Sequence, residues 1–203
     1  MSEPRVSVVI IGHRPALAVA AIASAHVQTY KNIEVLYKSH PELWPEKFNE
    51  AWAGASGTYL VFLPDDDTLL PTFVQRHVEA MEMVSADMAY SDFYVTGPLL
   101  LKWHLPPFTR GILRTTCVPY FTFMVRADFW RSIGGWHDIP HCDWDAGIRM
   151  LEAGANVVQL PNEYLWNRSH NPQSSSVLMT TGEFDAALFA LKDAHADFFR
   201  GTV

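Results

Sequence analysis

Three consecutive aspartates, Asp65, Asp66 and Asp67, follow an apolar run in this chain of 203 residues. The run covers residues 59–64, and its aromatic and aliphatic side chains predict a strand buried on both faces. Three adjacent carboxylates repel one another, and a divalent cation with oxygen ligands removes that repulsion. Because Mg²⁺ often binds with substrate phosphates, and α/β sheets bind ligands beyond the carboxyl ends of their strands, the triplet predicts a metal–nucleotide site.

A structural interpretation of the triplet stays open. Aspartate is a favourable N-cap residue, and a helix is expected soon after Thr68. One aspartate alone would favour a cap, whereas three after a buried strand favour the metal site.

Composition limits the classes of protein that the chain can belong to. With 49% hydrophobic and 18% charged residues it is globular, and its net charge of −7 argues against a broad basic surface for nucleic acid. Cys117 and Cys142 form no metal spacing and fit a reducing compartment. The amino terminus lacks a signal-peptide pattern, and no apolar run is long enough to span a bilayer, so we expect a soluble, cytoplasmic protein.

The elements that position the triplet alternate in type. Strands at 6–11, 33–37 and 59–64 are separated by helices at 16–27 and 46–55, which predicts a parallel sheet with crossover helices. Residues 96–119 are irregular and rich in proline. The remaining expected elements are a helix at 71–83, strands at 88–92 and 121–125, helices at 129–133 and 143–152, a last strand at 156–160, and a terminal helix at 183–199.

Seven segments in a fixed order carry a resemblance to a known family. They are residues 6–10, 28–35, 48–57, 62–71, 133–136, 142–154 and 166–170. Together they resemble the family 2 inverting glycosyltransferases with the GT-A fold, over nearly the whole length. The resemblance implies a single α/β GT-A domain with a mostly parallel central sheet flanked by helices. It also implies that residues 1–92 bind a nucleotide sugar, and that residues 93–203, with a C-terminal helix, bind the acceptor.

The resemblance also implies an activity and its cofactors. The family transfers a sugar from a nucleotide-diphosphate sugar to an acceptor hydroxyl, and Mn²⁺ or Mg²⁺ stabilises the diphosphate leaving group. By this resemblance Asp65 and Asp66 contact the donor, while Asp66, Asp67 and His170 bind the metal. Pro64 stands at the family's usual first-Asp position, which makes Asp66 the direct ligand and Asp67 the residue behind it.

The general base of the resembled family corresponds to Asp143, with Asp145 as the reserve. A simple N-cap role for Asp143 stays open. Cys142 stands where relatives usually have Glu.

Other expected donor contacts come from the loop after the first strand and from two basic residues. The stretch from Tyr37 to His40 lacks the carboxylate with which members of the resembled family contact the base. Residues 173–176 are expected to close over the donor. The expected contacts are Ile11, Gly12, His13, Arg14, Lys38 and Arg168.

Two other functions stay open. A nucleotidyltransferase acting on sugar phosphates would also use a carboxylate cluster, and a catalytically inactive sugar- or nucleotide-binding module would keep the fold alone. The acceptor can be a glycan, a lipid-linked sugar, a protein, a small molecule or a modified DNA base, and the oligomeric state is undetermined. The expected acceptor-facing residues within 96–119 are Lys102, Trp103, His104, Arg110 and Arg114.

Overall fold

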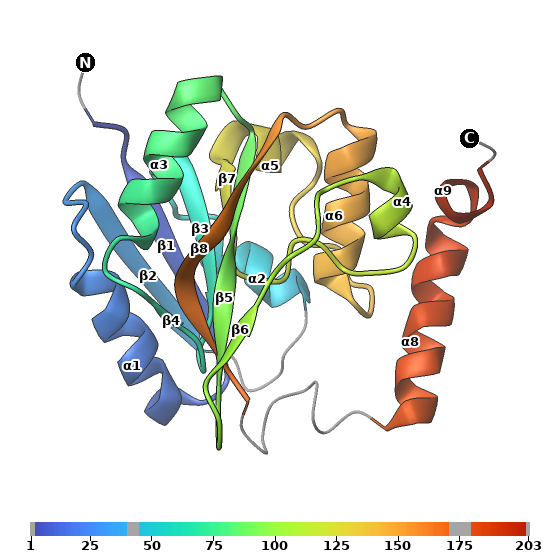
Figure 1. Cartoon of the computed structure of the whole chain (residues 1–203), viewed down its shortest axis with the longest axis horizontal. Helices are drawn as coiled ribbons and strands as arrows, with labels where there is room; N and C mark the ends of the chain where they lie inside the picture. The colour runs from blue at the N-terminus through green and yellow to red at the C-terminus, as the bar shows by residue number, and fades with distance from the viewer. Residues whose placement is uncertain (1–2, 40–44, 171–179, 202–203) are drawn as a thin grey trace.

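A computed structural model describes residues 3–39, 45–170 and 180–201. Within these residues, eight strands form one sheet in the order β2-β1-β3-β7-β5-β8-β4, and β6 pairs with β5 outside this path. Helices flank the sheet (Figure 1). No helix in the described part of the chain is long and apolar enough to cross a membrane.

The first half of the sheet is parallel. β1 (Val6–Gly12) pairs with both β2 (Ile33–Ser39) and β3 (Tyr59–Pro64), and α1 (Pro15–His26) and α2 (Pro45–Trp52) are the crossovers. Every residue of β1 is buried, as expected for a central strand covered on both faces. The register aligns Ile11 with Pro64, so the residues that follow these two strands emerge side by side.

The second half of the sheet is built on β5 (Met88–Thr96) and β8 (Val157–Ser169), which are parallel to each other. The carboxyl ends of both strands point to the bottom of Figure 1. The short antiparallel strands are β4 (Thr68–Leu69), β6 (Leu101–Trp103) and β7 (Met124–Arg126). The sheet is therefore mixed, and the expected parallel arrangement is confirmed for its five long strands.

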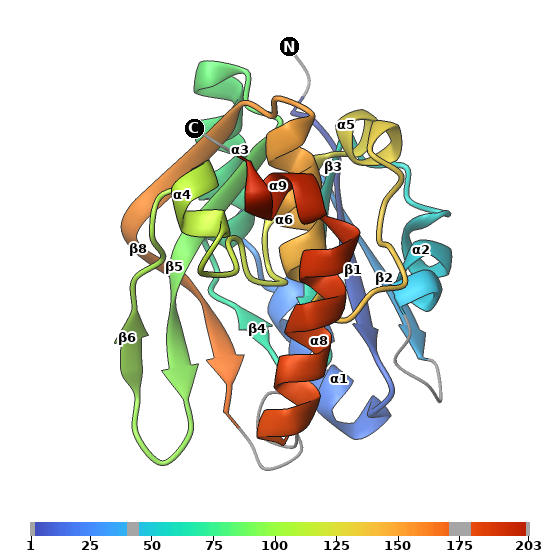
Figure 2. The same ribbon diagram turned by 90° about the vertical axis from the view of Figure 1, so that its right-hand side faces the viewer.

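The remaining helices pack against strands of the second half of the sheet or against one another. α3 packs against β5 and β8, α5 against β7, and α4 against α6. Figure 2 shows α8 and α9 in front of α6. The bounds are α3 (Phe73–Val84), α4 (Arg110–Leu113), α5 (Ala127–Ser132), α6 (Cys142–Glu152), α8 (Thr181–Ala194) and α9 (Ala196–Arg200).

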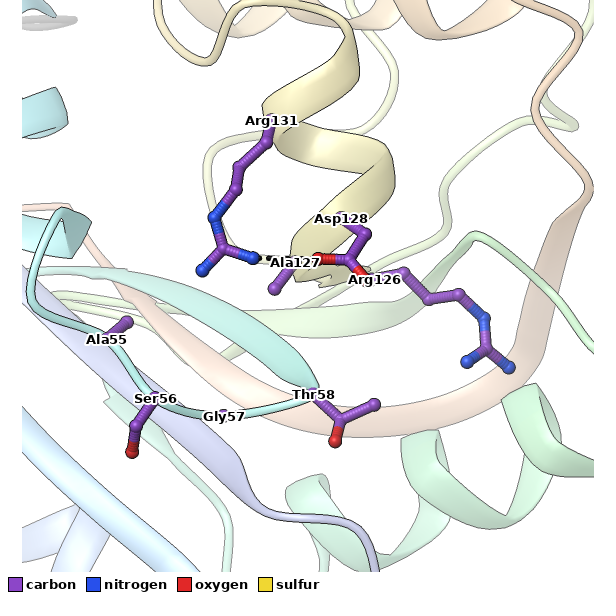
Figure 3. Close-up of a pocket in the computed structure, with 8 residues that line it drawn as sticks. All are labelled: Ala55, Ser56, Gly57, Thr58, Arg126, Ala127, Asp128 and Arg131. Carbon is purple, nitrogen blue, oxygen red and sulfur yellow. Dashed lines mark hydrogen bonds and ion pairs between the residues drawn. The ribbon is translucent and has the colours of Figure 1, made fainter.

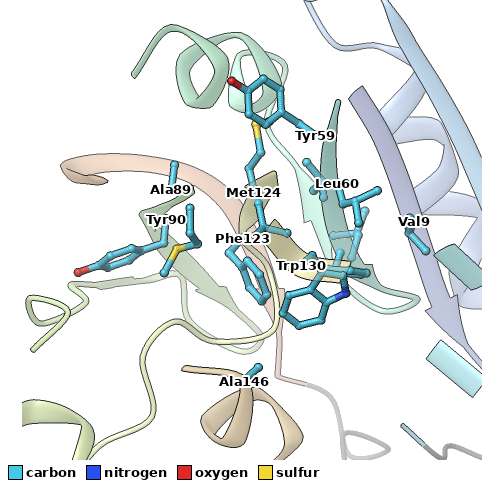
Figure 4. Close-up of a cluster of buried hydrophobic side chains, with 14 of the residues drawn as sticks. Val9, Tyr59, Leu60, Ala89, Tyr90, Phe123, Met124, Trp130 and Ala146 are labelled. Atoms are coloured by element: carbon cyan, nitrogen blue, oxygen red, sulfur yellow. The ribbon is translucent and has the colours of Figure 1, made fainter. Parts of the chain in front are cut away.

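An aromatic cluster fills the core between β3, β7 and α5. Phe62 lies 5.1 Å from Trp130 and 5.0 Å from Trp136 between ring centroids, and Phe123 lies 5.8 Å from Trp130. These side chains are fully buried, and Ala146 of α6 points toward Phe123 and Trp130 (Figure 4). Burial of each large side chain contributes roughly 2–3 kcal/mol, so the cluster holds β3 firmly.

Four expected elements differ from the structure. The strand expected at 156–160 continues to Ser169 as β8, and the one expected at 121–125 is β7, a shorter strand shifted to Met124–Arg126. The irregular stretch contains both β6 and α4. The terminal helix is two helices, because His195 leaves helical geometry with φ −115° and ψ 38°.

Candidate active site

The carboxylate of Asp65 lies against the backbone of Gly12. The Asp65 N–H donates to the Ile11 carbonyl at 2.9 Å, which continues the pairing of β1 and β3 by one residue. A Cβ atom on Gly12 would lie 2.0 Å from the Asp65 Cγ. Glycine is therefore required at this position because any side chain would occupy the space of the carboxylate.

Arg14 binds two of the three aspartates. Its backbone N–H donates to Asp65 Oδ2 at 2.8 Å, its Nε donates to Asp65 Oδ1 at 3.1 Å, and its Nη2 pairs with the same carboxylate. Nη2 also lies 3.2 Å from Asp66 Oδ2. Asp65 is buried, so this charge-assisted fork supplies the compensation that a buried carboxylate requires.

Asp67 has a different environment. Its Oδ1 accepts a hydrogen bond from the Ser169 N–H at 2.8 Å, which joins the turn after β3 to the end of β8. Burial, and next the charge of Asp66, raise the pKa of Asp67 to about 8. The charges of Arg168 and Arg14 oppose this rise but do not cancel it, so a cation would fit next to Asp66 and Asp67.

The third expected metal ligand, His170, is exposed, and its N–H donates to the Thr96 carbonyl at 2.7 Å. Among the described residues, no three His, Cys, Asp or Glu side chains converge in the way that an all-protein cation site needs. Asp66 and Asp67 could hold an ion whose other ligands are substrate phosphates and water, as is usual for Mg²⁺.

Arg168 of β8 immediately precedes Ser169, whose N–H donates to Asp67. The Arg168 guanidinium carbon is 4.9 Å from the centre of the Tyr120 ring. The charge of Arg168 acts on Asp67, and it also acts on Tyr120 and Cys117, on which Asp143 acts as well. One cation is therefore within electrostatic reach of both carboxylate groups, and a diphosphate could bind to it.

Asp143 begins the first turn of α6 and is half-buried. Its Oδ1 accepts a hydrogen bond from the Trp144 N–H at 3.0 Å, and the Trp144 indole donates to the Leu113 carbonyl at 2.7 Å. A Cβ atom on Gly147 would lie 2.4 Å from the Val118 carbonyl oxygen, so α6 packs directly on the preceding segment. These contacts fix the position of the first turn of α6, which carries the Asp143 side chain.

Asp145 is enclosed by one arginine and two histidines. Its carboxylate pairs with Arg149 at 2.8 Å and with His195 at 2.8 Å, and His137 lies 3.6 Å away. Burial alone would raise the pKa of Asp145, but the hydrogen bonds from His195 and Arg149 outweigh it and lower the pKa. Arg149 also donates to the carbonyls of Ile133 and Gly135. The Asp145 carboxylate thus connects α6 to the segment that contains Ile133 and Gly135 and to the junction of α8 and α9.

The remaining expected donor contacts lie at the rim. Lys38 pairs with Glu50 at 3.0 Å, and both side chains are exposed. His13 is exposed on the loop between β1 and α1. The expected donor-closing segment 173–176 lies outside the described residues.

A pocket at the start of β3 lies at the opposite end of that strand from the triplet. Gly57 and Thr58 form one wall, and Arg126 and Arg131 extend in different directions (Figure 3). Arg131 pairs with Asp128 at 2.8 Å. Since the two cations do not converge, this pocket has no evident anion-binding geometry.

Two residues near Asp143 were not among the sequence-based candidates. Tyr120 stacks under Arg168, and the Cys117 thiol lies close to Asp143 and donates to the Pro119 carbonyl at 3.4 Å. Neither belongs to a motif. They are brought to the site only by the packing of the segment between α4 and β7 against α6.

The mixed sheet with an aspartate-rich turn after β3 defines a GT-A glycosyltransferase fold. The chain belongs to glycosyl transferase family 2, whose family model matches residues 6–143. The expected family, fold and enzyme class are therefore confirmed. A comparison with curated proteins found no match.

Solved structures of TarS from S. aureus share this fold. The chain matches TarS 1-349 in complex with UDP-GlcNAc at a TM-score of 0.70 and 12% identity, covering 96% of this chain and 70% of that one. It matches another structure of TarS 1-349 at 0.64 and 14% identity, covering 81% and 60%. For TarS itself the values are 0.64 and 14%, covering 97% and 44%. The chain thus spans less than half of that whole enzyme.

Proposed function

We propose that this chain is an inverting glycosyltransferase that uses a nucleotide-diphosphate sugar and Mn²⁺ or Mg²⁺, with Asp143 as the general base. The observation that carries the proposal is the position of Arg168, which stacks on Tyr120 at 4.9 Å and immediately precedes Ser169, whose N–H donates to Asp67. A diphosphate bound there would leave its sugar between the triplet and Asp143. The TarS complexes with UDP-GlcNAc and UDP support this class of donor.

In the proposed reaction, the acceptor hydroxyl oxygen attacks the anomeric carbon while the bond to the diphosphate oxygen breaks in line. Asp143 takes the hydroxyl proton, and the nucleoside diphosphate leaves with the bonding electron pair. Arg168 stabilises the charge that develops on the leaving group. Asp66 and Asp67 would hold the ion that supplies further charge stabilisation.

Other residues have supporting roles in this proposal. Residues 1–92 bind the donor and residues 93–203 bind the acceptor, although Arg168 reaches back to the donor from β8. The carboxylate of Asp65 is held by Arg14, so Asp65 orients Arg14 toward the nucleotide and leaves the metal to its neighbours. Asp145 is the weaker candidate for the base because Arg149 and His195 occupy its carboxylate.

Two variants separate binding from chemistry. Asp66→Ala is expected to weaken Mn²⁺-dependent donor binding by at least about tenfold. Asp143→Ala should keep the donor affinity and lose roughly a hundredfold or more in turnover. Calorimetry with UDP-GlcNAc, then with a panel of other nucleotide sugars, measures affinity, and chromatography of the released nucleotide measures slow transfer to water.

Asp128→Ala is the matched control, because Asp128 is fully exposed near the opposite end of β3 and should change neither quantity. Unchanged donor affinity in Asp66→Ala would contradict the assignment of Asp66 as a metal ligand. Wild-type turnover in Asp143→Ala would contradict the assignment of Asp143 as the general base. Release of pyrophosphate instead of a nucleoside diphosphate would indicate a nucleotidyltransferase.

A further inference from the structure

The hairpin formed by β5 and β6 exposes a run of leucines at its turn. Leu99 is 71% exposed, Leu100 is 66% exposed and Leu101 is 51% exposed, and Trp103 follows at 46%. The turn extends below the rest of the sheet in Figure 2. Contiguous large apolar side chains on a protruding turn mark an interaction surface, since isolated exposed residues are common but such runs are not.

Aromatic rings and a lysine lie directly behind the leucines. The Lys102 ammonium is 4.8 Å from the centre of the Tyr164 ring, and that ring lies 5.0 Å from the ring of Tyr94. Trp103 stacks on Phe93. Apolar side chains at a tip, with Trp, Tyr and Lys one layer behind, match the layering of a bilayer interface, where rings and ammonium groups sit at the level of the headgroups.

The charge of this region also favours an anionic surface. Residues 93–103, which form the hairpin, contain one basic residue, Lys102, and no Asp or Glu, although the chain as a whole has a net charge of −7. The neighbouring carboxylate, Asp92, is 1% exposed and accepts hydrogen bonds within the fold, including one from the Leu105 N–H at 2.9 Å. The hairpin can therefore approach negative headgroups without opposing charges of its own.

The tip lies beside the candidate active site. The His170 N–H donates to the Thr96 carbonyl at 2.7 Å, and a Cβ atom on Gly97 would lie 3.2 Å from the His170 carbonyl oxygen. Ser169, one residue earlier, donates to Asp67. A surface that takes up the leucines would thus face the edge of the sheet at which transfer is proposed.

We propose that residues 97–103 insert into the interface of an anionic lipid bilayer, and that the acceptor hydroxyl is presented by a lipid in that surface. The docking itself follows from the hairpin, whereas the nature of the acceptor rests on the proposed glycosyl transfer. Docking needs no donor, so the two can be tested separately.

The test is co-flotation of the purified chain with vesicles of phosphatidylcholine, alone or mixed with phosphatidylglycerol. The wild type is expected to float with the mixed vesicles. The double variant Leu99→Ser, Leu100→Ser should bind about tenfold more weakly, and Lys102→Gln should lose roughly fivefold, and only on the mixed vesicles. Met83→Ser is the matched control, because Met83 is 82% exposed on α3, away from the hairpin.

Vesicle binding that is absent, or that the leucine variant retains, would overturn the proposal. Sedimentation of the same samples tests whether a second copy of the chain binds this surface instead. A wild-type dimer that becomes monomeric in the leucine variant, without vesicle binding, would assign the hairpin to contact between two copies of the chain. Neither readout depends on turnover, so the result stands whether or not Asp143 is the base.

Discussion

Gly12 and Arg14 together determine how the first aspartate of the triplet is used. The absence of a side chain on Gly12 lets the Asp65 carboxylate lie against β1, where the backbone and guanidinium of Arg14 bind it. The same guanidinium reaches Asp66. One cation of the chain thus compensates Asp65 and Asp66, whereas burial still raises the pKa of Asp67.

Gly12→Ala should displace Asp65 and release Arg14. The added methyl group would overlap the carboxylate, so we expect a loss of about 1–3 kcal/mol in stability and a donor affinity roughly tenfold lower. Urea unfolding and calorimetry measure the two effects. Gly54→Ala is the control, because nothing lies within 4 Å of a Cβ atom there. If Gly12→Ala and Gly54→Ala had the same stability and donor affinity, the contact between Gly12 and Asp65 would contribute to neither.

The residues around the triplet were predictable in type but not in pairing. A buried strand followed by acidic residues marks Asp65, Asp66 and Asp67 in the sequence, and the loop after the first strand marks Arg14. The ion pair between Arg14 and Asp65 joins residues 51 positions apart. It depends on the register that aligns Ile11 with Pro64, and no local pattern encodes that register.

Among the elements, β8 shows why the sequence was misread. The expected strand ended at Leu160, and the next residues, Pro161 and Asn162, are typical turn residues. Asn162 does adopt a left-handed φ of 63°, but its N–H donates to Asp92 Oδ2 at 2.8 Å on the neighbouring strand. The turn residues therefore form a bulge, with register shifts around Asp92, and the strand continues to Ser169. By contrast β1 and β3, which are continuous buried runs, were predicted closely.

Helix α6, which carries Asp143, is bound to the C-terminal helices through Asp145. Asp145, on the first turn of α6, binds Arg149 of the same helix and His195 at the junction of α8 and α9. Arg149 binds the backbone before Trp136, whose own N–H donates to Asn49 of α2. Helices α2, α6, α8 and α9 thus share one polar network, so the position of Asp143 depends on the C-terminal helices.

Asp145→Asn should loosen those helices. Removing one partner of a buried ion pair leaves the other charges without compensation, which costs about 3 kcal/mol. Amide hydrogen exchange should rise in residues 181–200 and stay unchanged in 6–12. Asp197→Asn is the control because that side chain is fully exposed. Protection that is the same in both variants would mean that the network does not hold α8 and α9.

For the whole molecule, one buried histidine links stability to pH. His77 of α3 is fully buried, its Nδ1 lies 2.8 Å from the Phe73 carbonyl oxygen, and its Nε2 has no partner in the described structure. Burial lowers the pKa of His77 to about 4 from an ordinary value of 6.5. The unfolded chain therefore binds a proton between pH 6.5 and 4 that the folded chain does not bind.

Because the folded pKa is the lower one, the contribution of His77 is complete above pH 6.5 and is lost as the pH falls toward 4. The loss amounts to about 3 kcal/mol over that range. Urea unfolding at pH 7.5 and pH 5 should show a smaller decrease for His77→Gln than for the wild type. His26→Gln, at an exposed position on α1, should follow the wild type. A decrease of the same size in all three proteins would assign the pH dependence to other groups.

The hydrogen bond from the Ser169 N–H to Asp67 joins residues 102 positions apart. During synthesis the chain leaves the ribosome from its amino terminus, so the triplet is complete long before its partner exists. Until residue 169 has emerged, Asp67 stays hydrated, and neither Arg168 nor β8 is in position. Pairing across such separations is slow, because the entropy of closing the loop is lost before the contact forms. The environment of Asp67 is therefore completed only after residue 169 has been made, however early the triplet itself appears.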